Sequence, residues 1–301
     1  MSTRDLMDIV TPSHLAYSNN NMTIQKSALL RTILTTIKFL FHKTFARPKM
    51  QRYNNFFLNM TLHARGYNNH NGFKRSGEAS FINILASYNP KICLDIGANS
   101  GEYSLKLLEN TNAYVIAFEP IPSAFKKLQK LSLSFPDRFK PENIGLGNVT
   151  KLSKIFYSDL TSEFASFANE VNEIDYVGRS NINSITVPMF TLDSWTQKNL
   201  KKNEVIDLIK IDVEGYEFEV LLGAKKTIID NSPKFIQIEF NRHQLIRKHT
   251  LLEFGEILSD YTCMQLLPFG SCFSKRDTTL PESNIFHYSN FVFVRKDLNL
   301  K

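Results

Sequence analysis

A strand that runs into a glycine-containing turn and then a helix is the most constraining feature of this sequence. Residues 91–94 supply a short apolar run, and apolar residues return at helical spacing in 103–108. The turn between them contains Gly97 and Gly101, which let the backbone turn tightly and approach a ligand. It lacks the Gly-x-Gly-x-x-Gly spacing of a dinucleotide fingerprint. The segment therefore predicts a nucleotide-binding turn of another kind.

Acidic residues mark the ends of the first two predicted strands. Asp95 precedes the first glycine, where an anion would repel a pyrophosphate and would suit a cationic ligand. Glu119 follows the apolar run 114–118, where a carboxylate can accept hydrogen bonds from a ribose diol. Together the two acids indicate a positively charged nucleoside without a diphosphate. S-adenosylmethionine fits that description.

Strands and helices alternate along most of the chain after residue 77. This alternation predicts an α/β fold in which a mostly parallel sheet is covered by helices on both faces. Predicted strands begin at 91 and cover 113–118, 139–144, 205–211, 234–240, 264–267 and 286–294, with extended segments at 152–157 and 185–190. Predicted helices cover 78–88, 123–133, 192–200, 216–229 and 251–258. Ligands in such sheets bind beyond the carboxyl ends of the strands.

A second group of charged residues follows the apolar strand 205–211. Alternation places Lys210 and Asp212 on one face, and Glu214 starts the next turn. Charges at the end of an apolar strand are costly unless they pair or function. A Lys210–Asp212 ion pair, with Glu214 as a helix N-terminal anion, would be purely structural. A catalytic role is favoured because this strand should adjoin the one that carries Asp95.

The next predicted strand ends in a similar way. Glu239 should point at the same crevice, and His243 lies close behind it in the sequence. A lone histidine is more often a hydrogen-bonded surface residue than a catalytic group. Asp212, Glu239 and His243 could also form an oxygen-rich site for a divalent metal, although their spacing matches no recognised ligand pattern. A site without metal is the preferred prediction.

The basic charge of the chain is concentrated at its N-terminal end. Residues 1–75 contain eleven Lys or Arg and two acids, a net charge of +9. The remaining residues contain 25 basic and 27 acidic side chains, a net −2, which accounts for the +7 of the whole chain. We predict a basic N-terminal extension over 1–76 and a catalytic domain over 77–301.

An amphipathic helix is predicted within this extension, from residue 23 to about residue 45. Its apolar face is wide, but Lys26, Arg31, Lys38 and Lys43 interrupt it too often for a membrane span. Arg47-Pro48 should end the helix. One interpretation packs the helix on the domain or on a twin subunit, and the other places it on anionic lipid. The first is preferred here because amphipathicity alone does not indicate lipid. The polar, Asn-rich residues 1–22 are expected to be disordered or loosely attached.

Cysteine usage and the first residues indicate the compartment. The three cysteines, an odd number, lack metal-ligand spacing and argue against a disulfide framework. The first residues include Asp5 and Asp8 and no apolar segment typical of a secretory signal. The expected location is the cytoplasm, with peripheral attachment to the inner face of the membrane as an alternative.

Taken together, these motifs resemble the FkbM family of S-adenosylmethionine-dependent methyltransferases. The resemblance covers about residues 78–240 and rests on the order and spacing of several short motifs. These are the turn 95–101, Ala117-Phe118-Glu119-Pro120, Thr191-Leu192-Asp193, the strand and turn 207–215, Glu217, Leu222-Gly223-Ala224, and the strand 233–239.

The resemblance implies a class I methyltransferase (Rossmann-like) fold. Its sheet has seven strands, mostly parallel, with an antiparallel final strand at 286–294. By the same resemblance, the methionine end of the cofactor is lined by Asp95, Gly97, Asn99 and Gly101. Glu119 holds the ribose, and Asn143 and Gly145 lie on the adenine side.

Family members typically methylate hydroxyl groups of surface-glycan sugars or of natural products. A carbohydrate or lipid-linked glycan is therefore the expected partner. A sugar hydroxyl needs a base that accepts its proton. Asp212 is the first choice, with Lys210 setting its charge or acting itself if burial lowers the lysine pKa. Glu214 and Glu239 are expected to position the acceptor.

Two other functions fit the sequence less well. Methylation of an exocyclic amine on RNA usually shows Asn/Asp-Pro-Pro-aromatic where this chain has residues 211–214, and a carbon-5 mechanism needs a cysteine nucleophile there. Because the basic charge lies outside the catalytic part, no nucleic-acid partner is expected. A scaffold without activity is disfavoured by Asp95, Glu119 and Asp212.

Overall fold

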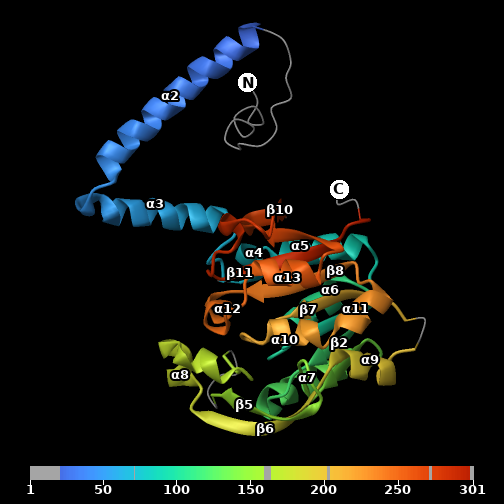
Figure 1. The fold of residues 1–301 in the computed structure, drawn as a ribbon. Helices are drawn as coiled ribbons and strands as arrows, with labels where there is room; N and C mark the ends of the chain where they lie inside the picture. The colour runs from blue at the N-terminus through green and yellow to red at the C-terminus, as the bar shows by residue number, and fades with distance from the viewer. Residues whose placement is uncertain (1–20, 71, 159–163, 202–203, 271–272, 299–301) are drawn as a thin grey trace. The chain divides into compact units, whose positions relative to one another are not determined.

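The computed structural model describes residues 21–70, 72–158, 164–201, 204–270 and 273–298 (Figure 1). The chain divides into two compact units, residues 1–59 and 60–301. The second unit contains the large sheet and the candidate site. Leu62 and Tyr67 belong to its hydrophobic core, so that core already includes residues that precede the predicted start of the catalytic domain at 77.

An eight-stranded sheet forms the centre of the second unit. Its strand order is β10-β9-β11-β8-β7-β1-β2-β3. The strands are β1 (Ile92–Ile96), β2 (Tyr114–Phe118), β3 (Phe139–Glu142), β7 (Ile206–Ile211), β8 (Phe235–Phe240), β9 (Tyr261–Leu266), β10 (Phe273–Lys275) and β11 (Ser289–Arg295). The run from β3 to β8 is parallel, whereas β11 is antiparallel to both β8 and β9. The predicted class of fold is confirmed.

The sheet has one strand more than predicted. β10 pairs antiparallel with the edge strand β9, through Phe273 opposite Leu266 and Lys275 opposite Met264. Such a short, half-exposed segment carries no apolar run that would mark it as a strand. The eighth strand therefore extends the edge farthest from the candidate site.

A small second sheet follows the third strand. It consists of β4 (Gly145–Leu146), β5 (Lys151–Tyr157) and β6 (Asn183–Phe190), in the order β4-β6-β5. The predicted strand 139–144 is shorter than expected and ends at Glu142, because the chain then crosses into this second sheet. The extended segments predicted at 152–157 and 185–190 are its two long strands.

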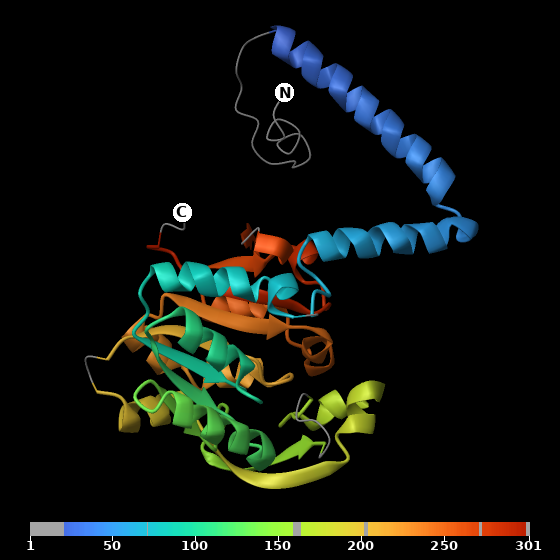
Figure 2. The ribbon, with the colours of Figure 1, turned by 180° about the vertical axis from the view of Figure 1, so that it is seen from behind.

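Helices cover both faces of the large sheet (Figures 1 and 2). α9, α10 and α13 contribute Leu192, Val220 and Phe254 to one core cluster, and α5 and α6 contribute Phe81 and Leu107 to the other. The helices of this unit are α4 (Phe73–Ser76), α5 (Glu78–Ser87), α6 (Glu102–Asn110), α7 (Pro122–Ser134), α8 (Asp175–Ser180), α9 (Leu192–Asn199), α10 (Glu217–Leu222), α11 (Lys225–Asn231), α12 (Arg242–Arg247) and α13 (Leu251–Ile257). Alternate strand residues thus face two separate hydrophobic layers.

The single helix predicted over 216–229 is wrong: two helices, α10 and α11, replace it. They are separated at Gly223, where a Cβ atom would lie 2.0 Å from the carbonyl oxygen of Gly147. The backbone of the turn that precedes β5 therefore passes directly against this point. Tertiary contact, which periodicity does not record, breaks the helix.

The first unit is helical in its described part. α2 (Asn21–Phe45) ends just before Arg47-Pro48, as predicted, and a 3₁₀ turn (Pro48–Met50) leads into α3 (Gln51–Ala64), which was not predicted. The Asn54 amide donates a hydrogen bond to the carbonyl oxygen of Phe45 at 2.9 Å, which links the two helices. The predicted disorder over 1–22 falls almost wholly outside the described residues. Among those residues, no helix has the length and apolar character needed to cross a bilayer.

Candidate active site

A cleft lies at the carboxyl ends of β1, β2 and β7, where the strand order reverses around β1. The side chains and backbone of the turns after these strands line it, together with the small second sheet. Its lining residues are Ile96, Gly97, Asn99, Phe118, Glu119, Pro120, Ile144, Gly145, Leu146, Ile155, Ala165, Phe167, Asp212, Val213 and Glu214. Three of them are acidic, and none of these lining residues is Lys or Arg. The cleft therefore suits a cationic ligand and disfavours a polyphosphate.

The glycine turn after β1 lies against the turn after β7. Gly97 has φ of +82°, and a Cβ atom on it would lie 1.8 Å from the carbonyl oxygen of Asp212. The amides of Gly97 and Ala98 both donate to the carbonyl oxygen of Phe118 at 3.0 Å. Gly101 caps α6, and a Cβ there would lie 2.6 Å from the Leu128 side chain. Only glycine fits either position without displacing its neighbours.

Glu119 lines the cleft with a carboxylate fixed by backbone donors. Its Oε2 accepts from the Asn99 amide and its Oε1 from the Ile121 amide, each at 2.8 Å. Burial raises the pKa of Glu119 to about 7, although these two hydrogen bonds oppose the rise. Each oxygen retains a lone pair that a hydroxyl could use. The predicted ribose-binding carboxylate is thus held in place on the cleft wall.

This raised pKa predicts how stability depends on pH. Between about 4.5 and about 7 the unfolded chain loses the Glu119 proton while the folded protein keeps it. The free energy of unfolding should therefore fall as pH rises through this window, with no further contribution from Glu119 above it. Urea unfolding across the window should give a shallower fall for Glu119→Gln than for the unmodified chain. The exposed Glu102→Gln serves as control, and equal slopes in all three proteins would contradict the prediction.

Asn143, predicted to lie on the adenine side, is not among the residues that line the cleft. Its amide donates to the carbonyl oxygens of Glu119 at 2.8 Å and Pro120 at 3.2 Å. The side chain therefore fixes the turn that carries Glu119. Gly145 does line the cleft, and a Cβ on it would lie 2.3 Å from the Phe167 ring. That ring is packed directly on its backbone.

Asp95 is fully buried and is not among the residues that line the cleft, and its predicted contact with the cofactor stays a prediction. Its Oδ2 accepts from the Ser104 hydroxyl at 2.6 Å, and its Oδ1 lies 3.4 Å from the Lys210 Nζ. The partners of the Asp95 carboxylate thus lie beneath the floor of the cleft. A buried charge needs such partners because it has lost its contact with water. Asp95 acts on the cleft only through Lys210. Gly101, the N-cap of α6, is not among the lining residues either.

Lys210 joins Asp95 to the cleft. Its Nζ lies 3.0 Å from Asp212 Oδ2 and 5.2 Å from the centre of the Tyr103 ring, and its side chain is buried. Burial favours a lower pKa, but Asp212, Asp95 and Glu78 outweigh it and hold the pKa of Lys210 above its usual value. The lowered pKa that Lys210 would need to act as the base is therefore not what its neighbours produce. Lys210 is a fixed cation that holds the Asp212 carboxylate.

Asp212, Glu214 and Glu239 bring their carboxylates together. One oxygen from each lies within 4.8 Å of the others, an arrangement that could hold a metal ion. This set differs from the predicted one, because His243 lies behind Glu214 with its Nδ1 3.0 Å from Glu214 Oε2. Asn241 donates to Glu239 at 2.6 Å. Of the three carboxylates, Asp212 and Glu214 line the cleft itself, whereas Glu239 is nearly buried.

The electrostatics of this group follow from burial. Burial raises the pKa of Glu239 well above its usual value, and the charges of Asp212 and Glu214 add to the rise. Burial also raises the pKa of Glu214, against the opposing effect of His243. For His243, burial lowers the pKa but contact with Glu214 outweighs it, so that the net pKa is raised. The Glu214 carboxylate therefore stabilises the charged form of His243 relative to the free side chain.

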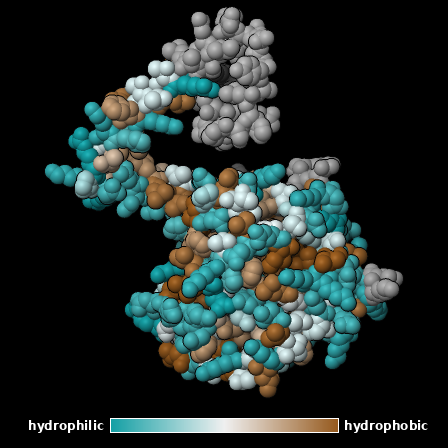
Figure 3. Space-filling view, viewed as in Figure 1, coloured by the Kyte–Doolittle hydropathy of each residue, from teal (hydrophilic) through white to brown (hydrophobic). Residues whose placement is uncertain are grey.

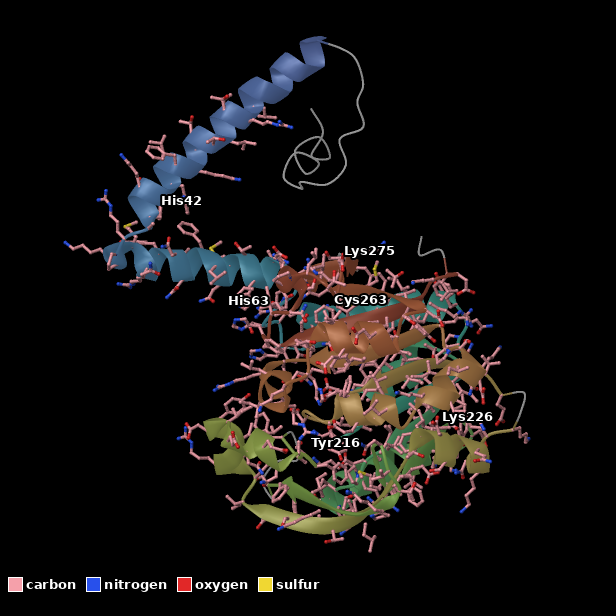
Figure 4. All side chains as sticks on the ribbon, in the orientation of Figure 1. His42, His63, Tyr216, Lys226, Cys263 and Lys275 are labelled. Carbon is pink, nitrogen blue, oxygen red and sulfur yellow. The ribbon has the colours of Figure 1, made fainter. Side chains whose placement is uncertain are left out.

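The wall provided by the second sheet was not predicted. Phe167, Ala165 and Ile155 reach the cleft from β5 and the segment that follows it. The Ser166 hydroxyl donates to the Glu214 carbonyl oxygen at 2.7 Å, which ties this segment to the turn after β7. The Phe167 ring also lies 5.6 Å from the ring of Tyr216, which Figure 4 labels. No motif in the sequence marks these residues, because they act by packing alone.

Comparison with known proteins assigns the sequence to a family. The sequence matches the model of the Methyltransferase FkbM domain over residues 95–259. The 2-O-methyltransferase NoeI of Sinorhizobium fredii is 28% identical over 180 residues, which are 54% of this chain and 68% of that protein. The hexuronic acid methyltransferase AglP of Haloferax volcanii is 26% identical over 168 residues, with 55% and 63% covered. The chain thus spans about two thirds of the length of these relatives.

A solved structure of methyltransferase FkbM from Methylobacillus flagellatus is similar at a TM-score of 0.41 and 18% identity, over 68% of this chain and 43% of that one. The family model covers more than half of the present sequence, including the turn after β1 and the turn after β7. The resemblance drawn from the sequence is confirmed, and the chain belongs to the FkbM methyltransferase family.

Proposed function

We propose that this protein is an S-adenosylmethionine-dependent O-methyltransferase that acts on a hydroxyl group of a sugar, most simply one in a surface glycan. Family membership supports methyl transfer, and the two relatives named above support a sugar acceptor. The observation that carries the proposal is the shared cleft of Glu119 and Asp212, which face it from the ends of β2 and β7. A small-molecule natural product with a free hydroxyl is the alternative acceptor.

The cleft residues fit the cofactor chemically. Glu119 has two oriented oxygens for the ribose diol, and Gly97 provides backbone without a side chain beside it. Gly145 and Phe167 form an apolar wall suited to the adenine. Asp212 and Glu214 supply negative charge for a sulfonium, and no lining Lys or Arg competes with it. We propose these residues as the cofactor site, together with Asn99, whose backbone amide joins the turn after β1 to Glu119.

When bound, S-adenosylmethionine supplies a methyl group on a sulfonium, which an oxygen nucleophile attacks as the carbon–sulfur bond breaks. A sugar hydroxyl is a weak nucleophile at neutral pH and must lose its proton during the attack. Asp212 is the proposed acceptor of that proton, because its carboxylate faces the cleft and is 31% exposed. Lys210 holds this carboxylate in position from below. Holding the hydroxyl in line supplies much of the remaining acceleration.

The other two carboxylates are proposed to position the acceptor. Glu214 lies beside Asp212 in the cleft lining, and His243 fixes it from behind. Glu239, which Asn241 orients, lies behind both. The raised pKa of Glu239 makes that side chain suitable as a hydrogen-bond donor as well as an acceptor, whereas Glu214, paired with His243, is suited to accept hydrogen bonds from a sugar hydroxyl.

Mass spectrometry of glycans tests the function directly. Surface polysaccharide from cells that lack the protein should be lighter by one methyl group on a single sugar. The intact gene should restore that methyl group, whereas a gene that encodes Asp212→Asn should not. Unchanged glycans in the deleted cells would overturn the surface-glycan acceptor and direct the search to small molecules.

Metal removal gives a further test of the site. Each of the three clustered carboxylates already has a partner, namely Lys210 for Asp212, His243 for Glu214 and Asn241 for Glu239. We therefore expect turnover to persist in EDTA. Loss of turnover in EDTA and its return with Mg²⁺ would show instead that the cluster works as a metal site.

A further inference from the structure

The N-terminal helix α2 presents a wide apolar face. At about 100° per residue, seven of its apolar side chains from Leu30 onward fall within an arc of about 140°, whereas Phe39 lies on the opposite side of the helix. The members of this arc are Leu30, Ile33, Leu34, Ile37, Leu40, Phe41 and Phe45. Thr44 also falls in the arc, and it donates its hydroxyl to the carbonyl oxygen of Leu40 at 2.9 Å, which removes its polar group from the face.

Four of these seven side chains are exposed, and the other three are half-buried. Ile37, Leu40 and Phe41 retain 56%, 57% and 51% of their accessible surface. Figure 3 shows the mixture of hydrophobic and hydrophilic side chains on the surface of this segment. Large apolar side chains gathered on one helix face mark an interaction surface, whereas single ones scattered over a protein do not.

The helix α3 repeats the pattern with aromatic residues. Tyr53, Phe56 and Phe57 lie at i, i+3 and i+4 and therefore on one face. They retain 55%, 59% and 52% of their accessible surface. Aromatic side chains are favoured at the boundary between water and lipid, where the ring enters the apolar layer. Both described helices of the first unit thus carry an uncovered apolar face.

Charge decides what such a face can bind. No Asp or Glu occurs from residue 9 to residue 77, and residues 30–59 contain six Lys or Arg. On α2, Arg31 and Lys38 flank one edge of the apolar arc, and Lys43 lies beyond the other. A second copy of this face would bring like charges together with no acid to compensate them. An anionic lipid surface would satisfy the apolar face and the basic edges at once.

We propose that the segment 30–59 binds an anionic membrane surface, with the apolar arc of α2 and the aromatic face of α3 inserted at the lipid boundary and the basic side chains among the head groups. The helices would lie in the plane of the membrane, as amphipathic helices do at a lipid surface. The proposal does not depend on the reaction that the second unit catalyses.

Sedimentation of the full-length protein with vesicles tests the proposal. Vesicles of phosphatidylcholine mixed with phosphatidylglycerol should bind the protein, and vesicles of phosphatidylcholine alone should bind it much more weakly. The double reversal Lys38→Glu/Lys43→Glu should weaken binding to anionic vesicles by at least about tenfold. Ile37→Asp/Phe41→Asp should weaken it by at least about 100-fold.

A matched control separates surface charge in general from this segment. Lys126→Glu/Lys130→Glu makes the same change in charge on the exposed face of α7 and should leave vesicle binding nearly unchanged. Thermal melting of each variant verifies that the second unit stays folded. Equal binding by all variants, or no binding to anionic vesicles, would overturn the proposal. A dimer that Ile37→Asp/Phe41→Asp dissociates without vesicles would assign the face to a twin subunit instead.

Discussion

Replacing Asp212 by Asn is expected to lower kcat by about 10²–10⁴-fold, the range of a lost general base. Asparagine keeps the shape of the side chain and an oxygen that can face Lys210, but it cannot accept the hydroxyl proton. The dissociation constant for S-adenosylmethionine should change little, because Glu119 and the turn after β1 remain intact. Turnover with a labelled methyl donor and calorimetry with the cofactor measure the two quantities separately.

A matched control makes this test specific. Glu102→Gln removes an exposed carboxylate at the start of α6, outside the cleft lining, and should keep full turnover. Near-normal turnover in Asp212→Asn would remove the residue from the proposed role.

Replacing Gly97 by Ala is expected to abolish cofactor binding and to lower the free energy of unfolding by about 3 kcal/mol or more. The new Cβ would lie 1.8 Å from the carbonyl oxygen of Asp212, and the backbone has φ of +82°. The turn after β1 and the turn after β7 must then separate. Chemical unfolding and calorimetry with S-adenosylmethionine measure the two losses.

Gly72 offers a matched control for the strain at Gly97. It has φ of +88°, but a Cβ on it would meet nothing within 4 Å. Gly72→Ala should therefore cost only the backbone strain, about 1–3 kcal/mol, and should leave cofactor binding intact. Equal losses in the two variants would show that φ alone, and not the approach of Asp212, requires the glycine.

Much of the fold could be predicted because apolar strands and their spacing are local features. Each predicted strand of the large sheet is present, and the resemblance supplied their arrangement. The break between α10 and α11 could not be predicted, since the helical pattern continues through Gly223 and only its approach to Gly147 interrupts it. β10 was missed because Phe273–Lys275 becomes a strand by pairing with β9.

The candidate site was predicted less completely than the fold. Sequence placed Glu119, Asp212 and Glu214 at one crevice, and the structure brings them together. The sequence does not distinguish residues on the cleft surface from residues in the layer beneath it. Asp95 lies in that lower layer with Ser104 and Lys210. Phe167 was missed because a single aromatic residue in a loop produces no periodic pattern in the sequence.

The contact between Gly97 and the Asp212 carbonyl has a consequence for how such enzymes diversify. The turn after β1, proposed for the methyl donor, and the turn after β7, proposed for the acceptor, approach each other through main-chain atoms. A change in the backbone of either turn would therefore displace the other. Changes in acceptor specificity must then arise from residues in other parts of the cleft. In the remaining wall, Gly145 and Phe167 are proposed for the adenine, which leaves Ile155 of β5 and Ala165 as positions that can change with the acceptor while the reacting centre keeps its alignment.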